Sequence, residues 1–488
     1  MEENETSTGR RLSWPIIAGF VVVIALILVG LSLPPISLFS RLGLGGGQTS
    51  AETPQATSGP AAGLPEGVAL TADGVDVSRV AAAELATAAG GTLADAAGAL
   101  PAGEIVSDAY ILGFGGDAPV GQITLPLPAG LSDTGTVDLY GWDGEHWAHV
   151  PGQIDGANSQ VVSAGGPLSR VLVLVRPGAP DAPVLAAEYA PGVEVPGDVN
   201  TLLGEVSVGA LVLGENGSLA GDIAEVPDDV AAETRFLRVT NRGAVIDQAA
   251  ISDLLNETAI QDAQISSLVG QTKAEGYSGV HVDYQGVPAS LTAAFTDMIT
   301  RLSDALHAEG LQLAVTLGTP ATVDGGWDSA GQDWAALGRA ADVVYVQMPL
   351  DPAAYADDGT AQSLLAWTVG QIDRKKVNLL LSAGPVDKVG EVFTELPLEQ
   401  ALADVGRLAI KGGVAEVEPG ATVDVLLEGS ATPLEWDGSA LAYKFTFGEE
   451  GQQQTVWLIS EAALANRLNL ARSYHLRGAT VTNMALGS

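Results

Sequence analysis

The sequence predicts an α/β protein whose largest part is a (β/α)8, or TIM, barrel, preceded by a small all-β sandwich and an N-terminal transmembrane helix. From residue 196 to 488, apolar strands alternate with amphipathic helices, the pattern of a parallel sheet covered by helices. Between residues 105 and 175, short apolar runs separated by turn residues are typical of a β-sandwich. Residues 14–33 form an almost unbroken apolar run.

The apolar run 14–33 has the length of a membrane span, since about 20 such residues cross the hydrocarbon core. Arg10 and Arg11 precede it and no further charge occurs before Arg41, so the positive-inside rule places residues 1–13 in the cytoplasm. We expect an uncleaved, single-pass signal anchor in the cell membrane, with the bulk of the chain extracytoplasmic. Residues 34–66, rich in Gly, Ser, Thr, Pro and Ala, read as a flexible linker.

Composition narrows the classes of protein that fit. The 488 residues include 22 Lys and Arg against 59 Asp and Glu, a net charge of −37, which argues against a nucleic-acid partner. The absence of cysteine excludes disulfides, thiolate metal sites and a cysteine nucleophile. No metal site and no organic cofactor is implied.

Residues 67–190 are predicted to form the β-sandwich. Asp143 and Gly144 are a strong turn pair, flanked by Trp142 and Trp147. These aromatic residues fit either a sugar-binding platform or the packing of the hairpin, and we favour packing because aromatic residues in hairpins are usually structural.

Residues 196–488 are predicted to form the barrel. We expect strands at 206–213, 234–240, 279–284, 311–317, 342–348, 377–383 and 478–484, and helices at 251–268, 290–309, 333–341, 363–372 and 463–474. This rhythm fits a closed barrel better than an open sheet. No G-x-G-x-x-G or phosphate-binding loop follows any of these strands, which disfavours a nucleotide-binding sheet.

The segment GYSGVHVDYQGV at 276–287 resembles the fourth-strand signature of family 18 glycoside hydrolases, most closely their bacterial wall- and spore-associated branch. Segments 302–317, 333–351 and 455–479 resemble later parts of that branch, in the same order. The resemblance implies a barrel with a small α+β insertion, here at about 385–460, that walls one side of the cleft. It also implies action on N-acetylglucosaminide bonds.

In this family a Glu near the end of the signature protonates the leaving oxygen. The Asp two positions earlier orients the substrate's N-acetyl group. The resemblance assigns the orienting role to Asp283, whereas the acid position is occupied by Gln285. A carboxamide cannot release a proton near neutral pH. Leu350 also replaces the strand-six Tyr of the family, and the last strand has no Trp.

The predicted site therefore has two catalytic positions, Asp283 and the degenerate acid position Gln285. The predicted substrate-binding residues are His281, Tyr284, Trp327, Met348, Asp351 and Asn483. His281 shares a strand face with Asp283, and Trp327 lies in a Gly-rich loop after strand five.

Three hypotheses follow. The first is a pseudoenzyme that binds cell-wall or N-acetylglucosamine-type glycan without cleaving it, or serves as an envelope scaffold with protein partners. The second is an active hydrolase of β-1,4 N-acetylglucosaminide bonds whose acid comes from elsewhere, for example Asp324, Asp328 or Asp351. The third is a structural barrel whose cleft has closed. We favour the first, because fold alone does not give function.

Overall fold

A computed structural model describes residues 63–482, apart from 86–102, 132, 181, 191–194, 244, 324–325, 330, 358, 406, 411–424, 429–431 and 449–452. The predicted anchor at 14–33 and Asn483 lie outside this part of the chain. Within it, no helix combines the length and the apolar character that a membrane crossing needs.

The region predicted as a sandwich contains two larger antiparallel sheets and a two-stranded one, in which β5 (Val120–Gly121) pairs with β11 (Gly166–Pro167). One larger sheet has the order β1-β6-β10-β9 and the other the order β2-β4-β12-β7-β8, with β3 paired to β12. Leu125 and Val161 of the first sheet and Leu112 and Leu174 of the second share one buried core. The strands are β1 (Ala69–Leu70), β2 (Asp76–Val80), β3 (Glu104–Ile105), β4 (Ala109–Gly113), β6 (Ile123–Pro126), β7 (Asp138–Trp142), β8 (Trp147–His149), β9 (Gly152–Asp155), β10 (Gln160–Ser163) and β12 (Val171–Arg176).

The predicted hairpin connects β7 and β8. Trp142 is paired with Trp147 across it, and their rings lie 5.8 Å apart. Trp142 is buried, and Asp143 accepts hydrogen bonds from the backbone of Glu145 and His146 within the turn. The two tryptophans therefore pack the hairpin and do not form a flat, exposed platform.

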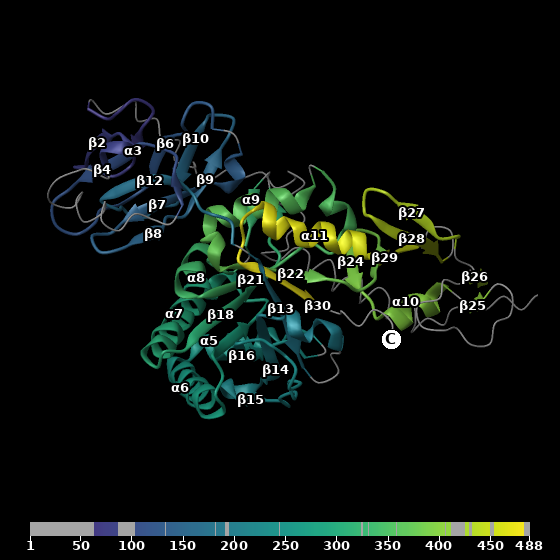
Figure 1. Cartoon of the computed structure of the whole chain (residues 1–488). Coiled ribbons are helices and arrows are strands. Elements are labelled where there is room, and N and C mark those ends of the chain that lie inside the picture. Colours follow the sequence, from purple (N-terminus) through teal and green to yellow (C-terminus); the bar gives the residue numbers. More distant parts are fainter. Residues whose placement is uncertain are drawn as a thin grey trace, which may run out of the picture. The chain divides into compact units, whose positions relative to one another are not determined.

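The second half of the chain contains a closed barrel of eight parallel strands (Figure 1). The strands are β13 (Val184–Tyr189), β14 (Glu205–Leu213), β16 (Thr234–Thr240), β17 (Gly279–Asp283), β18 (Gln312–Leu317), β21 (Val343–Gln347), β22 (Val377–Ser382) and β30 (Gly478–Thr482). Pairing of β13 with both β14 and β30 closes the ring.

The barrel begins earlier than predicted. Its first strand, β13, falls inside the range 67–190 that we assigned to the sandwich, so that boundary was wrong. The sequence of this six-residue strand, VLAAEY, fits either sheet, and only its pairing partners show which sheet it joins.

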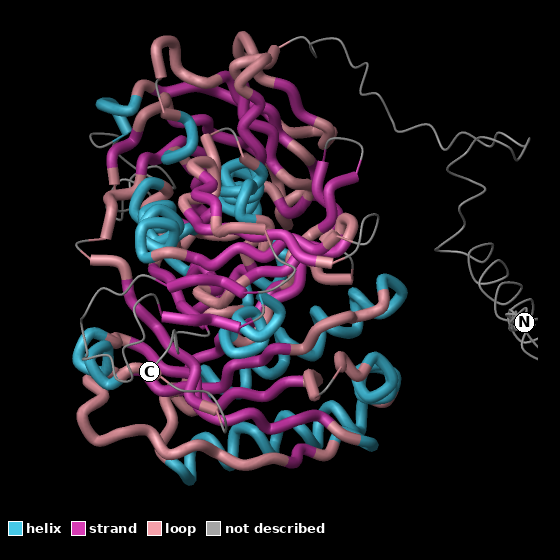
Figure 2. The backbone as a smooth tube through the Cα atoms, turned by 90° about the vertical axis from the view of Figure 1, so that its right-hand side faces the viewer, coloured by secondary structure: helices cyan, strands magenta, loops and turns pink. Residues whose placement is uncertain are grey.

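Helices lie outside the barrel strands (Figure 2). They are α5 (Gln248–Asn256), α6 (Thr258–Glu275), α7 (Thr292–Ala308), α8 (Trp334–Ala340), α9 (Thr360–Gln371) and α11 (Glu461–Ser473). The helix predicted at 251–268 is two helices, because Glu257 adopts an extended backbone conformation between them. In the described residues, β13 and β14 are followed by short 3-10 turns and not by α-helices.

The predicted insertion follows β22. It contains an antiparallel sheet with the order β24-β23-β29-β28-β27 and the helix α10 (Leu398–Val405). The strands of this sheet are β23 (Val386–Val389), β24 (Val392–Glu395), β27 (Glu435–Asp437), β28 (Ala442–Phe447) and β29 (Gln454–Ile459).

The sandwich contacts the barrel through the corner that follows α9. The guanidinium of Arg374 donates two hydrogen bonds to the carboxylate of Asp138, at 2.6 and 2.5 Å, and the two side chains are 0% and 1% exposed. The Tyr140 hydroxyl donates to Asp373, at 3.3 Å. The β7 strand of the sandwich is thereby fixed to the barrel by a buried ion pair.

Candidate functional site

Strand β17 brings the predicted catalytic positions to the C-terminal end of the barrel, where active sites of this fold lie. Side chains alternate between the two faces of a strand. His281, Asp283 and the following Gln285 therefore share one face, and all three are buried. The intervening Val282 and Tyr284 belong to the hydrophobic core on the other face.

Gln285 is fixed by hydrogen bonds of its side-chain nitrogen and of its backbone. Its side-chain amide donates to Asp283 Oδ1 at 2.9 Å and to the Thr316 carbonyl oxygen at 3.1 Å. Its backbone exchanges two hydrogen bonds with the Asn241 side chain, both at 2.8 Å. Both amide hydrogens are used, so the site accommodates a carboxamide at this position and not an ionised carboxylate.

The carboxylate of Asp283 already contacts arginine side chains of the protein. Its Oδ2 accepts a hydrogen bond from Arg238 Nη2 at 2.6 Å and lies 3.7 Å from Arg242 Nε. The Thr240 hydroxyl donates to the Asp283 carbonyl oxygen at 3.1 Å. In this arrangement any ligand of the Asp283 carboxylate must compete with Arg238.

Glu188 is a site residue that the sequence analysis missed. It lies on β13, its Oε1 is 3.7 Å from Arg238 Nε, and its side chain is 17% exposed. Burial raises the pKa of the Glu188 carboxyl, while Arg238 opposes this shift and Asp283 adds to it. Because β13 was assigned to the sandwich, nothing in the sequence connected Glu188 with the signature.

His281 is held inside the barrel as a neutral ring. Its Nδ1 lies 2.8 Å from the Ser207 hydroxyl and its Nε2 lies 2.6 Å from the Thr316 hydroxyl. The ring stacks on Tyr345 with 4.4 Å between centroids. Burial, with a smaller contribution from Arg238, holds the His281 pKa well below its ordinary value. His281 thus acts as a structural residue of the barrel interior.

This burial predicts a loss of stability in acid. The unfolded chain takes up a proton at His281 near its ordinary pKa of 6.5, whereas the folded chain does so only at lower pH. The free energy of unfolding should therefore fall as pH drops below about 6.5. Urea unfolding of wild type and His281→Gln between pH 7.5 and 5 measures it. We expect the free energy of unfolding of His281→Gln to depend less steeply on pH than that of wild type. The control His146→Gln, at an exposed position, should keep the wild-type dependence. Equal slopes in all three proteins would contradict the assignment.

A second polar cluster fills the barrel below this level. Glu205 is fully buried and accepts a hydrogen bond from the Tyr345 hydroxyl. It also pairs with Arg477 Nη2 at 2.6 Å. Glu205 therefore pairs with both Tyr345 and Arg477 in the barrel interior.

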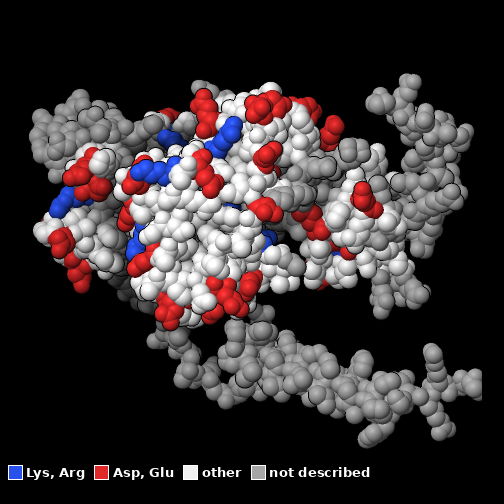
Figure 3. Space-filling model, turned by 90° about the horizontal axis from the view of Figure 1, so that it is seen from below, with Lys and Arg blue, Asp and Glu red and all other residues white. Residues whose placement is uncertain are grey.

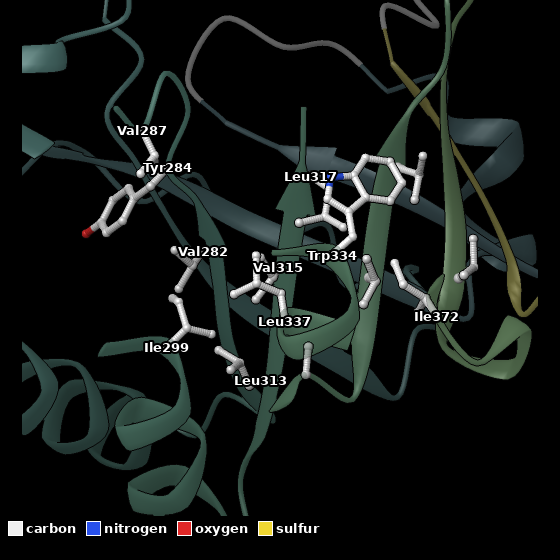
Figure 4. Close-up of a cluster of buried hydrophobic side chains, with 14 of the residues drawn as sticks. Val282, Tyr284, Val287, Ile299, Leu313, Val315, Leu317, Trp334, Leu337 and Ile372 are labelled. Atoms are coloured by element: carbon white, nitrogen blue, oxygen red, sulfur yellow. The ribbon is translucent and has the colours of Figure 1, made fainter. Parts of the chain in front are cut away.

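Two predicted substrate-binding residues belong to the hydrophobic core instead, which corrects the prediction. Tyr284 is 0% exposed, and its hydroxyl donates to Gln264 of α6 at 3.2 Å. Figure 4 shows Tyr284 and Val282 in the cluster that includes Ile299 of α7. Met348 is also buried in this cluster. Tyr284 follows the last residue of β17 and Met348 follows the last residue of β21, and both pack in the core that the helices share.

The remaining predicted residues do not meet Asp283 through any described contact. Asp351 caps a 3-10 turn by accepting a hydrogen bond from the Ala353 backbone at 2.9 Å. Trp327 lies on the short strand β20 (Gly326–Asp328) and packs near Trp367 of α9. Of the other acids considered, Asp328 is exposed, and Asp324 lies outside the described residues. The structure therefore brings together only His281, Asp283 and Gln285.

Comparison with known, curated proteins gives a relative, YdhD. No known family model matches the chain. The chain is 20% identical over 283 residues to YdhD of Bacillus subtilis (strain 168), a protein named as a sporulation-specific glycosylase. The match covers 55% of this chain and 63% of YdhD, so the chain spans less than two thirds of that relative.

Three solved structures each match about two thirds of the chain, all at TM-scores below 0.5. A chitinase from Chromobacterium violaceum ATCC 12472 is 19% identical, with 63% of this chain and 96% of that chain covered and a TM-score of 0.46. The spore cortex-lytic enzyme SleL of Bacillus megaterium QM B1551 is 15% identical, with 65% and 74% covered and a TM-score of 0.44. A family 18 N-acetylglucosaminidase from Paenibacillus barengoltzii is 14% identical, with 62% and 94% covered and a TM-score of 0.43. The resemblance to family 18 glycoside hydrolases indicated by residues 276–287 is confirmed.

Proposed function

We propose that this chain binds glycan at the cell envelope without cleaving it. The observation that carries the proposal is the hydrogen bonding of Gln285, whose amide donates to Asp283 and to Thr316. No transferable proton is present at the position that the family uses for its acid. Loss of general acid catalysis alone costs about 10²–10⁴-fold in rate.

The proposed ligand is a β-1,4-linked N-acetylglucosamine glycan of the peptidoglycan or chitin type. Support comes from the resemblance of residues 276–287 to the family signature, from the retained Asp283, and from similarity to a protein named as a glycosylase. Binding at Asp283 requires the ligand to displace Arg238 from the carboxylate, so we expect modest affinity.

We further propose that residues 14–33 anchor the chain in the membrane and that the barrel lies outside the cytoplasm. The net charge of −37 supports an uncharged ligand, because an acidic protein repels anionic polymers. Acidic side chains are spread over the face in Figure 3, with fewer basic ones between them.

Binding can be measured by equilibrium dialysis of the full-length chain in detergent against N-acetylglucosamine oligomers. We expect saturable binding that Asp283→Asn weakens by at least about tenfold, because Asp283 is the retained substrate-orienting residue. The matched control Asp297→Asn, exposed on α7, should bind as wild type does. If the wild-type chain binds none of the oligomers, a scaffold role replaces this proposal.

One observation favours a second candidate function, a hydrolase with a displaced acid. Glu188 presents a carboxyl group of raised pKa beside Arg238, and a raised pKa is what a general acid needs. In that case wild type would release short oligomers, and Glu188→Gln would abolish this activity. An activity unchanged in Glu188→Gln would exclude Glu188 as the acid.

A further inference from the structure

We propose that a cavity between the sandwich and the barrel is a second binding site, which takes an uncharged sugar ring. This junction cavity has a volume of about 350 Å³, at the small end of ligand pockets. Its lining includes Thr134, His149 and Gln153 of the sandwich side and Trp327, Ser363 and Trp367 of the barrel side. The proposal does not depend on binding at Asp283.

The walls of the junction cavity are held in place before any ligand binds. Gln153 Nε2 donates to the Trp367 carbonyl oxygen at 3.0 Å, and His149 Nε2 lies 3.1 Å from the Val369 carbonyl oxygen. Strand β9 approaches α9 so closely that a Cβ at Gly370 would lie 2.5 Å from the Gly152 carbonyl oxygen. The buried Asp138–Arg374 pair fixes the same corner. A preformed site avoids the entropic cost of ordering its walls on binding.

Two indole rings contribute to the barrel side of the cavity. The rings of Trp327 and Trp367 lie 6.4 Å apart at an interplanar angle of 38°. The buried Trp334 packs against Trp367, with 4.7 Å between their ring centroids. Both lining rings are partly buried, so they retain some accessible surface. Aromatic surface of this kind suits the apolar C–H face of a pyranose ring.

The sandwich side offers hydrogen-bonding atoms. Because the Val369 carbonyl oxygen only accepts, His149 Nε2 is the donor of that contact, which leaves Nδ1 able to accept a hydrogen bond. Gln153 uses its amide nitrogen for Trp367, which leaves Oε1 as a second acceptor. Within the described part of the chain, neither atom has a protein hydrogen-bond partner. Sugar hydroxyl groups are donors that match them.

The charge of the lining selects against ionic ligands. Asp138 is its only Asp, Glu, Lys or Arg, and both carboxylate oxygens of Asp138 accept from Arg374. An anionic ligand would find no unpaired cationic side chain in the lining of this cavity. A cationic ligand would find no unpaired carboxylate in that lining. Aromatic surface, neutral acceptors and compensated charge together indicate an uncharged carbohydrate.

The test is calorimetric titration of the full-length chain with the N-acetylglucosamine trimer, with tryptophan fluorescence recorded in parallel. We expect Trp327→Ala and Gln153→Leu each to weaken one binding event by about tenfold or more. Trp436→Ala, a control at a half-exposed tryptophan of the insertion, should behave as wild type.

The outcomes separate this site from the one at Asp283. The junction cavity is supported if one binding event is lost in Trp327→Ala and the same event is retained in Asp283→Asn. This holds whatever happens to binding at Asp283. Wild-type affinity in both Trp327→Ala and Gln153→Leu overturns the proposal, as does a wild-type chain that gives neither heat nor a fluorescence change. Unchanged thermal melting of Gln153→Leu excludes misfolding as the cause of a loss.

Discussion

Replacing Asp138 with alanine is expected to lower the free energy of unfolding by about 3–5 kcal/mol, because it leaves a buried arginine without its counter-charge. Arg374 is 0% exposed and donates two hydrogen bonds to Asp138. Its remaining donor contacts are the backbone oxygens of Gly135 and Tyr474, which cannot neutralise the charge. Urea unfolding of wild type and Asp138→Ala measures the difference.

An exposed ion pair provides the control. Lys273 and Glu309 are 63% and 41% exposed, so Glu309→Ala should cost less than about 1 kcal/mol. The double variant Asp138→Leu with Arg374→Met should recover most of the loss, since it removes both charges and keeps the volume. A loss below about 1 kcal/mol in Asp138→Ala would show that the pair does not hold the sandwich to the barrel.

Replacing Gln285 with glutamate is expected to destabilise the chain without creating a hydrolase. The introduced oxygen would face Asp283 Oδ1 and the Thr316 carbonyl oxygen, which now accept from the amide. Two buried acceptors would lose their donor, at about 1–3 kcal/mol. Hydrolysis should stay absent because Arg238 still occupies Asp283 and Leu350 still replaces the strand-six Tyr.

The pH dependence identifies the cause of that loss. Burial beside Asp283 should raise the pKa of the introduced carboxyl above its unfolded value of about 4.3. The penalty is then complete at neutral pH and shrinks as pH falls toward about 4.3. Gln248→Glu, exposed in the first turn of α5, is the control and should show no such penalty. Oligomer cleavage by Gln285→Glu would refute the structural argument against turnover.

The rhythm of strands and helices was sufficient to predict the barrel from β14 onward. The first strand could not be predicted, because β13 carries no local mark of the sheet it joins. Because β13 was assigned to the sandwich, Glu188 and its ion pair with Arg238 were not predicted. Only the register of the barrel strands brings Arg238 beside Asp283. Long-range pairing of this kind has no counterpart in sequence spacing.

The alternation of residues along β17 was sufficient to predict that His281, Asp283 and Gln285 share a face. The same alternation places Tyr284 on the outer face, so its assignment to the site was avoidable. Arg238 was different: the strand 234–240 was predicted, but its alignment beside β17 depends on the closed barrel. The ion pair between Arg238 and Asp283 could therefore be identified only from the structure.

Hydrolysis by the wild-type chain tests the central claim most directly. The purified full-length chain is incubated with the N-acetylglucosamine pentamer, and products are followed by mass spectrometry over many hours at several pH values. We predict no shorter oligomers beyond those in a protein-free blank. Steady release of such oligomers by wild type, abolished in Glu188→Gln, would contradict the account and assign the missing acid to Glu188.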